Sequence, residues 1–144
     1  CTVIRLMLKR TPNPNKDLER YLQHRIKYTK AIGSRTYPIS ELEIRERILK
    51  DLASSDYNPG GGKRQLAALM QAGDIRMSIH KIKCPTQVIH GDCDPLVPLA
   101  CGLDVHKNIA HSTMFIIKDM GHSLHEYFID ELVSKIQLMK LKAL

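Results

Sequence analysis

The chain has 144 residues, which is enough for one domain, and 43% of them are hydrophobic. No apolar run approaches the ~18 residues that a membrane span needs, so we expect no membrane-embedded segment. Four cysteines are too few and too irregularly spaced for a disulfide scaffold. We expect reduced thiols at Cys84, Cys93 and Cys101, which favours the cytoplasm.

The net charge of +7 is unevenly distributed along the chain. Residues 1–83 carry 17 Lys and Arg against 8 Asp and Glu, whereas residues 84–144 carry 5 against 7. A basic surface can bind nucleic acid, but these basic residues are scattered and no set of stacking aromatic side chains accompanies them. The pattern favours a solvated helical surface, and we expect no nucleic-acid partner.

Two amphipathic helices are predicted in the first part of the chain. Asn13 can cap the first helix, and Gly33 is a natural stop for it. Ser40 and Glu43 have the spacing of a capping box at the start of the second. The apolar stripe of the first helix comprises Leu18, Tyr21, Leu22 and Ile26, and that of the second comprises Ile44, Ile48, Leu49 and Leu52.

The strongest break in the chain is the Asn-Pro-Gly-Gly-Gly run at residues 58–62. We place a domain boundary there, with residues 1–59 before it and residues 60–144 after it. A third helix is predicted over residues 63–73, and Gly73 ends it. Its apolar face comprises Leu66, Leu69 and Met70.

A strand, a helix and a second strand are predicted in the following part of the chain. The runs at residues 86–90 and 113–118 are short, apolar and rich in β-branched residues, which is typical of buried strands. Residues 99–110 between them are long enough for the helix of a parallel crossover. His90 falls inside the first strand, where we expect it to be buried and hydrogen-bonded.

Titratable side chains follow both predicted strands. Asp94 comes shortly after the first, before a proline that limits its backbone freedom, and His122 comes shortly after the second. Because the carboxyl ends of parallel strands meet at one edge of a sheet, where catalytic groups gather, we expect these two side chains to lie within hydrogen-bond reach. A carboxylate hydrogen-bonded to an imidazole supplies two of the three members of a nucleophile–His–acid triad.

A long amphipathic helix is predicted over residues 124–142, suited to packing on a sheet. Its apolar stripe comprises Leu124, Phe128, Leu132, Ile136 and Met139. Two strands cannot bury both faces of a parallel sheet beneath such helices. We therefore expect a further sheet-bearing segment to be missing from this chain.

Residues 82–98, Ile-Lys-Cys-Pro-Thr-Gln-Val-Ile-His-Gly-Asp-Cys-Asp-Pro-Leu-Val-Pro, followed by Gly121-His122, resemble the C-terminal part of α/β-hydrolases. Residues 64–74 are similar to the segment that joins lid to core in bacterial esterases of that superfamily, such as aclacinomycin methylesterase. The resemblance implies an α/β fold. Residues 1–59 would be a helical lid, and residues 60–144 the C-terminal part of the hydrolase core.

The activity that the resemblance implies is hydrolysis of a carboxylic ester or related acyl compound by a Ser-His-Asp mechanism. Asp94 would be the acid and His122 the base, in the order that the superfamily uses. Such an enzyme needs no metal or organic cofactor. Its partners would be a small-molecule ester and the missing N-terminal half of the fold, with neither nucleic acid nor membrane involved.

The superfamily carries its nucleophile on a G-x-S-x-G motif, and this sequence contains none. Ser34 follows Gly33 but lacks the rest of the motif, and Ser123 lies after the proposed base. The oxyanion-hole segment is also missing, and position 1 is not a Met. We expect a fragment whose nucleophile lies upstream and which hydrolyses nothing appreciable alone.

Three alternatives remain open at this stage. Asp92 is a rival for the acid of the triad. A metal-dependent hydrolase could use a cluster of His90, Asp92, Asp94, His122 and His125, although their spacing matches no metal signature. A chain without a nucleophile could also be a non-catalytic remnant or a binding module.

Overall fold

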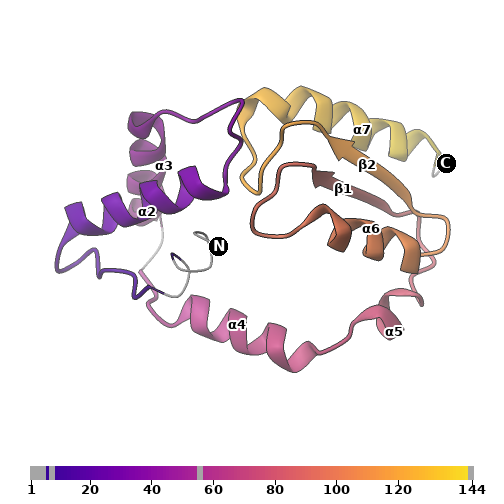
Figure 1. Cartoon of the computed structure of the whole chain (residues 1–144), viewed down its shortest axis with the longest axis horizontal. Helices are drawn as coiled ribbons and strands as arrows, with labels where there is room; N and C mark the ends of the chain where they lie inside the picture. The colour runs from indigo at the N-terminus through magenta and orange to yellow at the C-terminus, as the bar shows by residue number, and fades with distance from the viewer. Residues whose placement is uncertain (1–5, 7–8, 55–56, 143–144) are drawn as a thin grey trace. The chain divides into compact units, whose positions relative to one another are not determined.

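The computed structural model describes every residue except 1–5, 7–8, 55–56 and 143–144 (Figure 1). The chain forms two compact units. The helical unit comprises Cys1–Ala31 and Ile39–Ile75, and the sheet unit comprises Ile32–Pro38 and Arg76–Leu144. None of the described helices is long and apolar enough to cross a membrane.

The core of the helical unit lies between α2 (Leu18–Ile32) and α3 (Glu41–Ser54). Both helices turn an apolar stripe inward, as their sequence spacing predicts. The buried residues are Tyr21, Leu22, Ile26, Ile44 and Ile48. Leu49 of the predicted stripe lies at the margin and is 38% exposed. The unit thus has a small core of its own.

The cap predicted for α2 was wrong, and the one predicted for α3 was right in part. The Asp17 carboxylate accepts the Arg20 N–H and caps α2, because Asn13 closes a separate turn by accepting the Asn15 N–H. Ser40 Oγ accepts the Glu43 N–H at 3.2 Å. The Glu43 side chain forms an ion pair with the next turn of its own helix.

The third helix, α4 (Gly61–Ala72), is confirmed, and Gly73 follows it with a φ of +58° that suits glycine. No residue of α4 is buried. Leu66, Leu69 and Met70 are 52%, 67% and 78% exposed.

The sheet unit is built on a parallel pair of strands, β1 (Gln87–Gly91) and β2 (Thr113–Ile117), joined by α6 (Leu99–Asn108). The strand–helix–strand prediction is therefore confirmed, with Val88 paired to Met114 and Gly91 to Ile117. A short helix, α5 (Arg76–Ile79), precedes the sheet. After it come the 3-10 turn η1 (Glu126–Phe128) and the terminal helix α7 (Ile129–Lys142).

The helices α6 and α7 cover opposite faces of the sheet (Figure 1). His90 of β1 packs on Gly102 of α6, whereas the ring of Phe115 on β2 lies 4.3 Å from the Lys135 ammonium of α7. The register pairs His90 with Ile116, the residue next to Phe115, and successive strand residues face opposite sides. The described part of the unit is thus a helix–sheet–helix sandwich with two strands.

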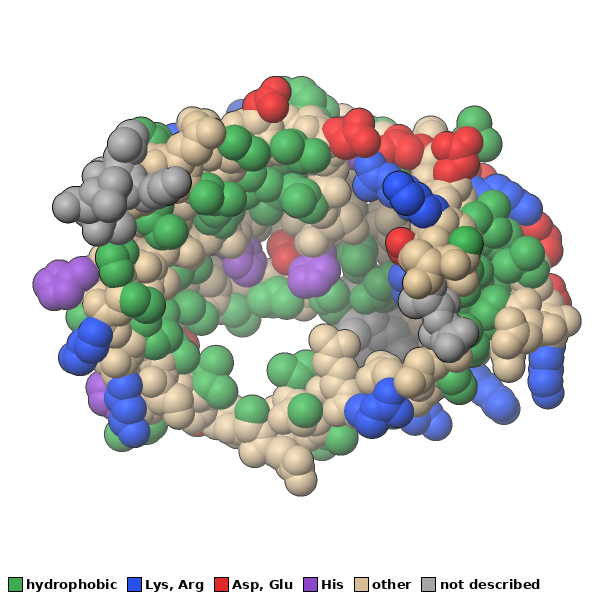
Figure 2. Space-filling model, turned by 180° about the vertical axis from the view of Figure 1, so that it is seen from behind, with side chains coloured by type: hydrophobic (Ala, Val, Ile, Leu, Met, Phe, Trp, Pro, Cys, Tyr) green, Lys and Arg blue, Asp and Glu red, His purple; other side chains and the backbone are tan. Residues whose placement is uncertain are grey.

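The sheet unit leaves much apolar surface uncovered (Figure 2). Val88 and Ile89, expected to be buried, are only partly so, because two strands leave the described sheet without neighbours at its edges. Ile117 is fully buried, but other apolar side chains are 43–53% exposed: Leu103, Ile116, Val133 and Ile136.

The observed mixture of helices and parallel strands is compatible with a partial α/β fold.

The segment at Ile32–Pro38 joins the sheet unit through aromatic contacts. Tyr37 stacks on Tyr127 with ring centroids 3.6 Å apart, and their hydroxyl groups are hydrogen-bonded at 2.9 Å. The buried Phe128 ring meets Tyr37 edge-on. These contacts fix the segment beside the start of α7.

We predict that Gly91→Ala destabilises the protein, because the added methyl group would overlap the carbonyl oxygen of Met120. The expected loss is about 1–3 kcal/mol in the free energy of unfolding, measured with urea. Gly62→Ala is the matched control: its new methyl group meets nothing within 4 Å, and alanine favours a helix. Equal stability of the two variants would contradict the close packing at Gly91.

Candidate functional site

The structure brings Asp94 and His122 into direct contact at the end of the sheet. The Asp94 carboxylate oxygen Oδ2 lies 2.8 Å from His122 Nδ1. The Asp94 side chain is 6% exposed, whereas that of His122 is 40% exposed. A buried carboxylate thus holds a partly exposed imidazole, and Nδ1 carries the shared proton when the carboxylate is ionised.

A tight turn after β1 orients Asp94. Its other oxygen, Oδ1, accepts the backbone N–H groups of Leu96 and Val97 at 2.8 and 2.9 Å. Such turns, in which a side chain accepts nearby amides, are a usual role of Asp. Because Oδ1 is occupied by the backbone, Oδ2 is presented to the imidazole.

These contacts also set the ionisation of Asp94. Burial raises the pKa of the carboxyl group, but hydrogen bonds from the Val97 amide, His122 and the Leu96 amide lower it by more. The pKa of Asp94 therefore lies below its ordinary value. At neutral pH the site holds a carboxylate.

The loop after β2 is fixed from the other side. The His122 N–H donates to the Ile32 carbonyl at 2.7 Å, and a Cβ at Gly121 would lie 2.5 Å from the carbonyl carbon of Gly33. Only glycine permits this approach of two backbones. In the described part of the chain, His122 Nε2 makes no hydrogen bond, so it is the ring atom able to exchange a proton.

His90 supports the turn that carries Asp94. Its Nε2 lies 3.0 Å from the Val97 carbonyl oxygen and 4.0 Å from Asp94 Oδ2. The expected hydrogen bond is confirmed, whereas the side chain, which was expected to be buried, is partly buried and 13% exposed. Gly102, which sequence reasoning missed, makes room for the ring, because a Cβ there would lie 2.7 Å from His90 Nδ1.

Asp92, the rival acid, is directed elsewhere. Its Oδ1 accepts the Asp119 N–H at 2.7 Å. The carboxylate that meets the His122 ring is that of Asp94.

The residues of the metal interpretation do not form a ligand cluster. The ring of His125 accepts the Tyr127 N–H and caps η1, while His90 and Asp92 bind backbone groups. Among the described residues, no group of three or more His, Cys, Asp or Glu side chains is placed to hold a metal ion. The donor set therefore gives no support to a metal centre.

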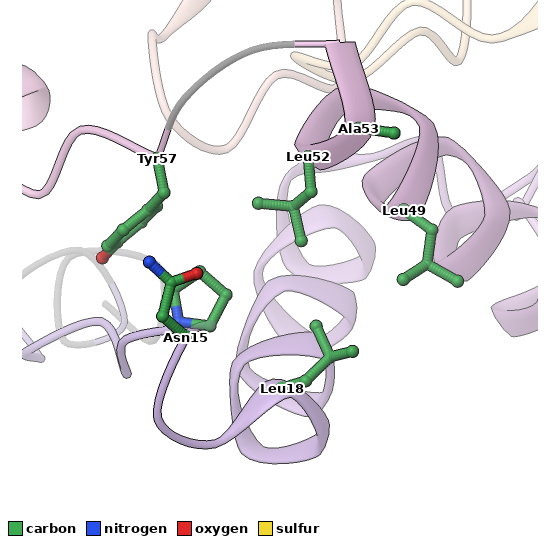
Figure 3. A pocket seen from close by; sticks show the side chains of 7 residues that line it. Asn15, Leu18, Leu49, Leu52, Ala53 and Tyr57 are labelled. Atoms are coloured by element: carbon green, nitrogen blue, oxygen red, sulfur yellow. The ribbon is translucent and has the colours of Figure 1, made fainter.

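A pocket of about 370 Å³ lies within the helical unit (Figure 3). Leu18 of α2 and Leu49 and Leu52 of α3 line it, together with Tyr57. Neither Asp94 nor a histidine is among its lining residues, so it adds no second acid–base candidate.

Part of the chain is similar to known enzymes. Over 70 residues it is 33% identical to serine hydrolase BPHL of Homo sapiens and 30% identical to serine hydrolase BPHL of Mus musculus. This similarity supports the resemblance to the α/β-hydrolase superfamily that the sequence motifs indicate. The match covers 49% of this chain and 24% of each relative, so it spans about a quarter of their length. No family model matches the chain.

We predict that the Asp94 carboxyl group titrates below its ordinary value of about 4. A lowered folded-state pKa means that the stabilisation from this group is complete above the unfolded pKa and is lost as the pH falls through the folded pKa. In His122→Ala the midpoint should rise, because one hydrogen bond to the carboxylate is lost. Carboxyl ¹³C NMR measures the titration midpoint of Asp94 in the wild type and in His122→Ala.

His80→Ala removes an exposed imidazole elsewhere and should leave the midpoint unchanged. A wild-type midpoint at or above 4 would argue against the contacts described around Asp94.

Proposed function

We propose that this chain supplies the acid and the base of a serine hydrolase that acts on a carboxylic ester or a related acyl compound. The observation that carries the proposal is the 2.8 Å contact between Asp94 Oδ2 and His122 Nδ1 at the carboxyl end of parallel strands. The similarity to serine hydrolases supports the same conclusion.

In this mechanism His122 acts first as a base and then as an acid. Its Nε2 takes the proton of an attacking serine hydroxyl and returns it to the leaving alkoxide. A water molecule activated in the same way then releases the acyl group. Asp94 keeps the proton on Nδ1 and stabilises the imidazolium that forms.

We further propose that the serine and the oxyanion hole lie outside this chain, in an N-terminal half of an α/β-hydrolase core. Two observations support this: the sequence has no G-x-S-x-G motif, and apolar side chains of α6, α7 and β2 are exposed. Further strands would cover such side chains.

The exposed cysteines Cys84, Cys93 and Cys101 are free thiols, which supports a reducing compartment such as the cytoplasm.

Residues 1–59, with the helices α2 and α3, are our candidate for the lid, and residues 60–144 for the C-terminal part of the core. Lids of two packed helices exclude water and shape the substrate pocket. The small core around Leu22 and Ile44 supports this role, because it allows the helices to stay folded around their own contacts. The resemblance to bacterial esterases supports a carboxylic ester as the substrate.

Asp94→Asn in the full-length protein that contains this chain should lower kcat by about 10⁴-fold, because an amide places the wrong proton pattern on the imidazole. Turnover of a p-nitrophenyl ester measures the loss, and circular dichroism checks that the fold is kept. Asp130→Asn, which removes an exposed acid from α7, is the control and should keep wild-type turnover. Normal turnover of Asp94→Asn would refute the assignment.

The 144-residue chain alone should hydrolyse no ester and should increase the fluorescence of ANS through its exposed apolar surface. The full-length protein should do the reverse and should react with a fluorophosphonate probe at a serine. A dye-silent, compact 144-residue chain would contradict the missing-half proposal. A full-length protein without a fluorophosphonate-reactive serine would identify the chain as a non-catalytic remnant or binding module.

A further inference from the structure

We propose that Asp92 is a positioning residue for His122, acting through the backbone of the loop that carries the imidazole. This inference rests on the proposed function. It assigns a separate task to each of two carboxylates only two residues apart. Asp94 binds the ring of His122, and Asp92 binds the main chain three residues before it.

The first support is the hydrogen bond from the Asp119 N–H to Asp92 Oδ1, at 2.7 Å. This bond joins the side chain of a residue in the loop after β1 to the backbone of the loop after β2. Asp119 has a φ of +61°, a left-handed conformation that is uncommon for residues other than glycine, although Asp is among those that tolerate it. The Asp92 carboxylate stabilises this turn at the amide where the loop leaves β2.

The second support is the set of backbone contacts around this hydrogen bond. The Asp92 N–H donates to the Ile117 carbonyl, and the Cys93 N–H donates to the Met120 carbonyl. At Gly91 the same Met120 carbonyl comes too close for any Cβ. The two loops therefore run in fixed register from the strand ends, and the Asp92 side chain is the part of this junction that a single substitution can remove.

The third support is the short path from the junction to the ring. Only Met120 and Gly121 separate Asp119 from His122. Beyond them, the His122 N–H is held by the Ile32 carbonyl. The loop is thus fixed at both ends, with Asp92 at one end and Ile32 at the other. Loss of the Asp92 end would let the ring move with respect to Asp94 Oδ2.

The test compares Asp92→Asn with Asp92→Ala in the full-length protein that contains this chain. Both variants remove the charge, but only Asn keeps an acceptor oxygen where Asp92 Oδ1 stands. Two quantities are measured: kcat and KM for an ester, and the tautomer of the His122 ring by NMR after labelling histidine with ¹⁵N.

We expect Asp92→Asn to keep kcat within about twofold and Asp92→Ala to lose about tenfold in kcat with little change in KM, because a displaced base affects the chemical step. In Asp92→Ala the Nδ1–H tautomer of His122 should lose population, and in Asp92→Asn it should be retained. A residue that only stabilises the fold would not separate the two variants in this way.

Equal tautomer populations in both variants and the wild type would overturn the proposal, as would equal impairment of both. If Asp92→Ala does not fold, Asp92→Ser takes its place, because the serine Oγ stands one bond short of the lost oxygen. Wild-type behaviour of Asp92→Ser would also overturn the proposal. The tautomer measurement needs no turnover. An inactive protein whose variants still differ in the tautomer would therefore contradict the hydrolase function and leave the positioning role supported.

Discussion

The parallel pairing of β1 with β2 is the constraint on which the site depends. Both strands run in the same direction, so both loops leave the sheet at the same edge, and the register sets Gly91 beside Ile117 at that edge. The crossover through α6 makes this arrangement possible. A carboxylate and an imidazole that are 28 positions apart in sequence then meet at 2.8 Å. An antiparallel hairpin of the same strands would send the two loops to opposite ends.

Around this edge, most of the polar atoms near Asp94 fix the position of its carboxylate and of the turn that carries it. One carboxylate oxygen is held by two amides of its own turn, and His90 binds the carbonyl of the same turn. The second oxygen alone meets the imidazole. This division explains why the Asp94 carboxyl group stays ionised although it is buried: the hydrogen bonds that stabilise the charge are mostly local and are formed by the backbone.

Much of this arrangement was predictable from sequence, because periodicity and turn residues act locally. The strands, the crossover helix and the pairing of Asp94 with His122 follow from short runs and their order. The cap of α2 was wrong because Asn13 and Asp17 are both good acceptors, and the choice between them depends on the turn that precedes the helix. The partial burial of Val88 and the fit of Gly102 to His90 depend on contacts between distant segments, which a pattern does not contain.

The anchoring of the His122 loop on Ile32 has a consequence for dissecting this protein. The sheet unit is discontinuous in sequence, because Ile32–Pro38 belongs to it although the helical unit surrounds that segment in the chain. A truncation that begins at Arg76 would delete the carbonyl that receives the His122 amide, together with the tyrosine stacked on Tyr127. A truncation at the glycine-rich run of residues 58–62 would delete the same segment, because Ile32–Pro38 precedes that run. Either cut therefore separates the imidazole from part of its own scaffold.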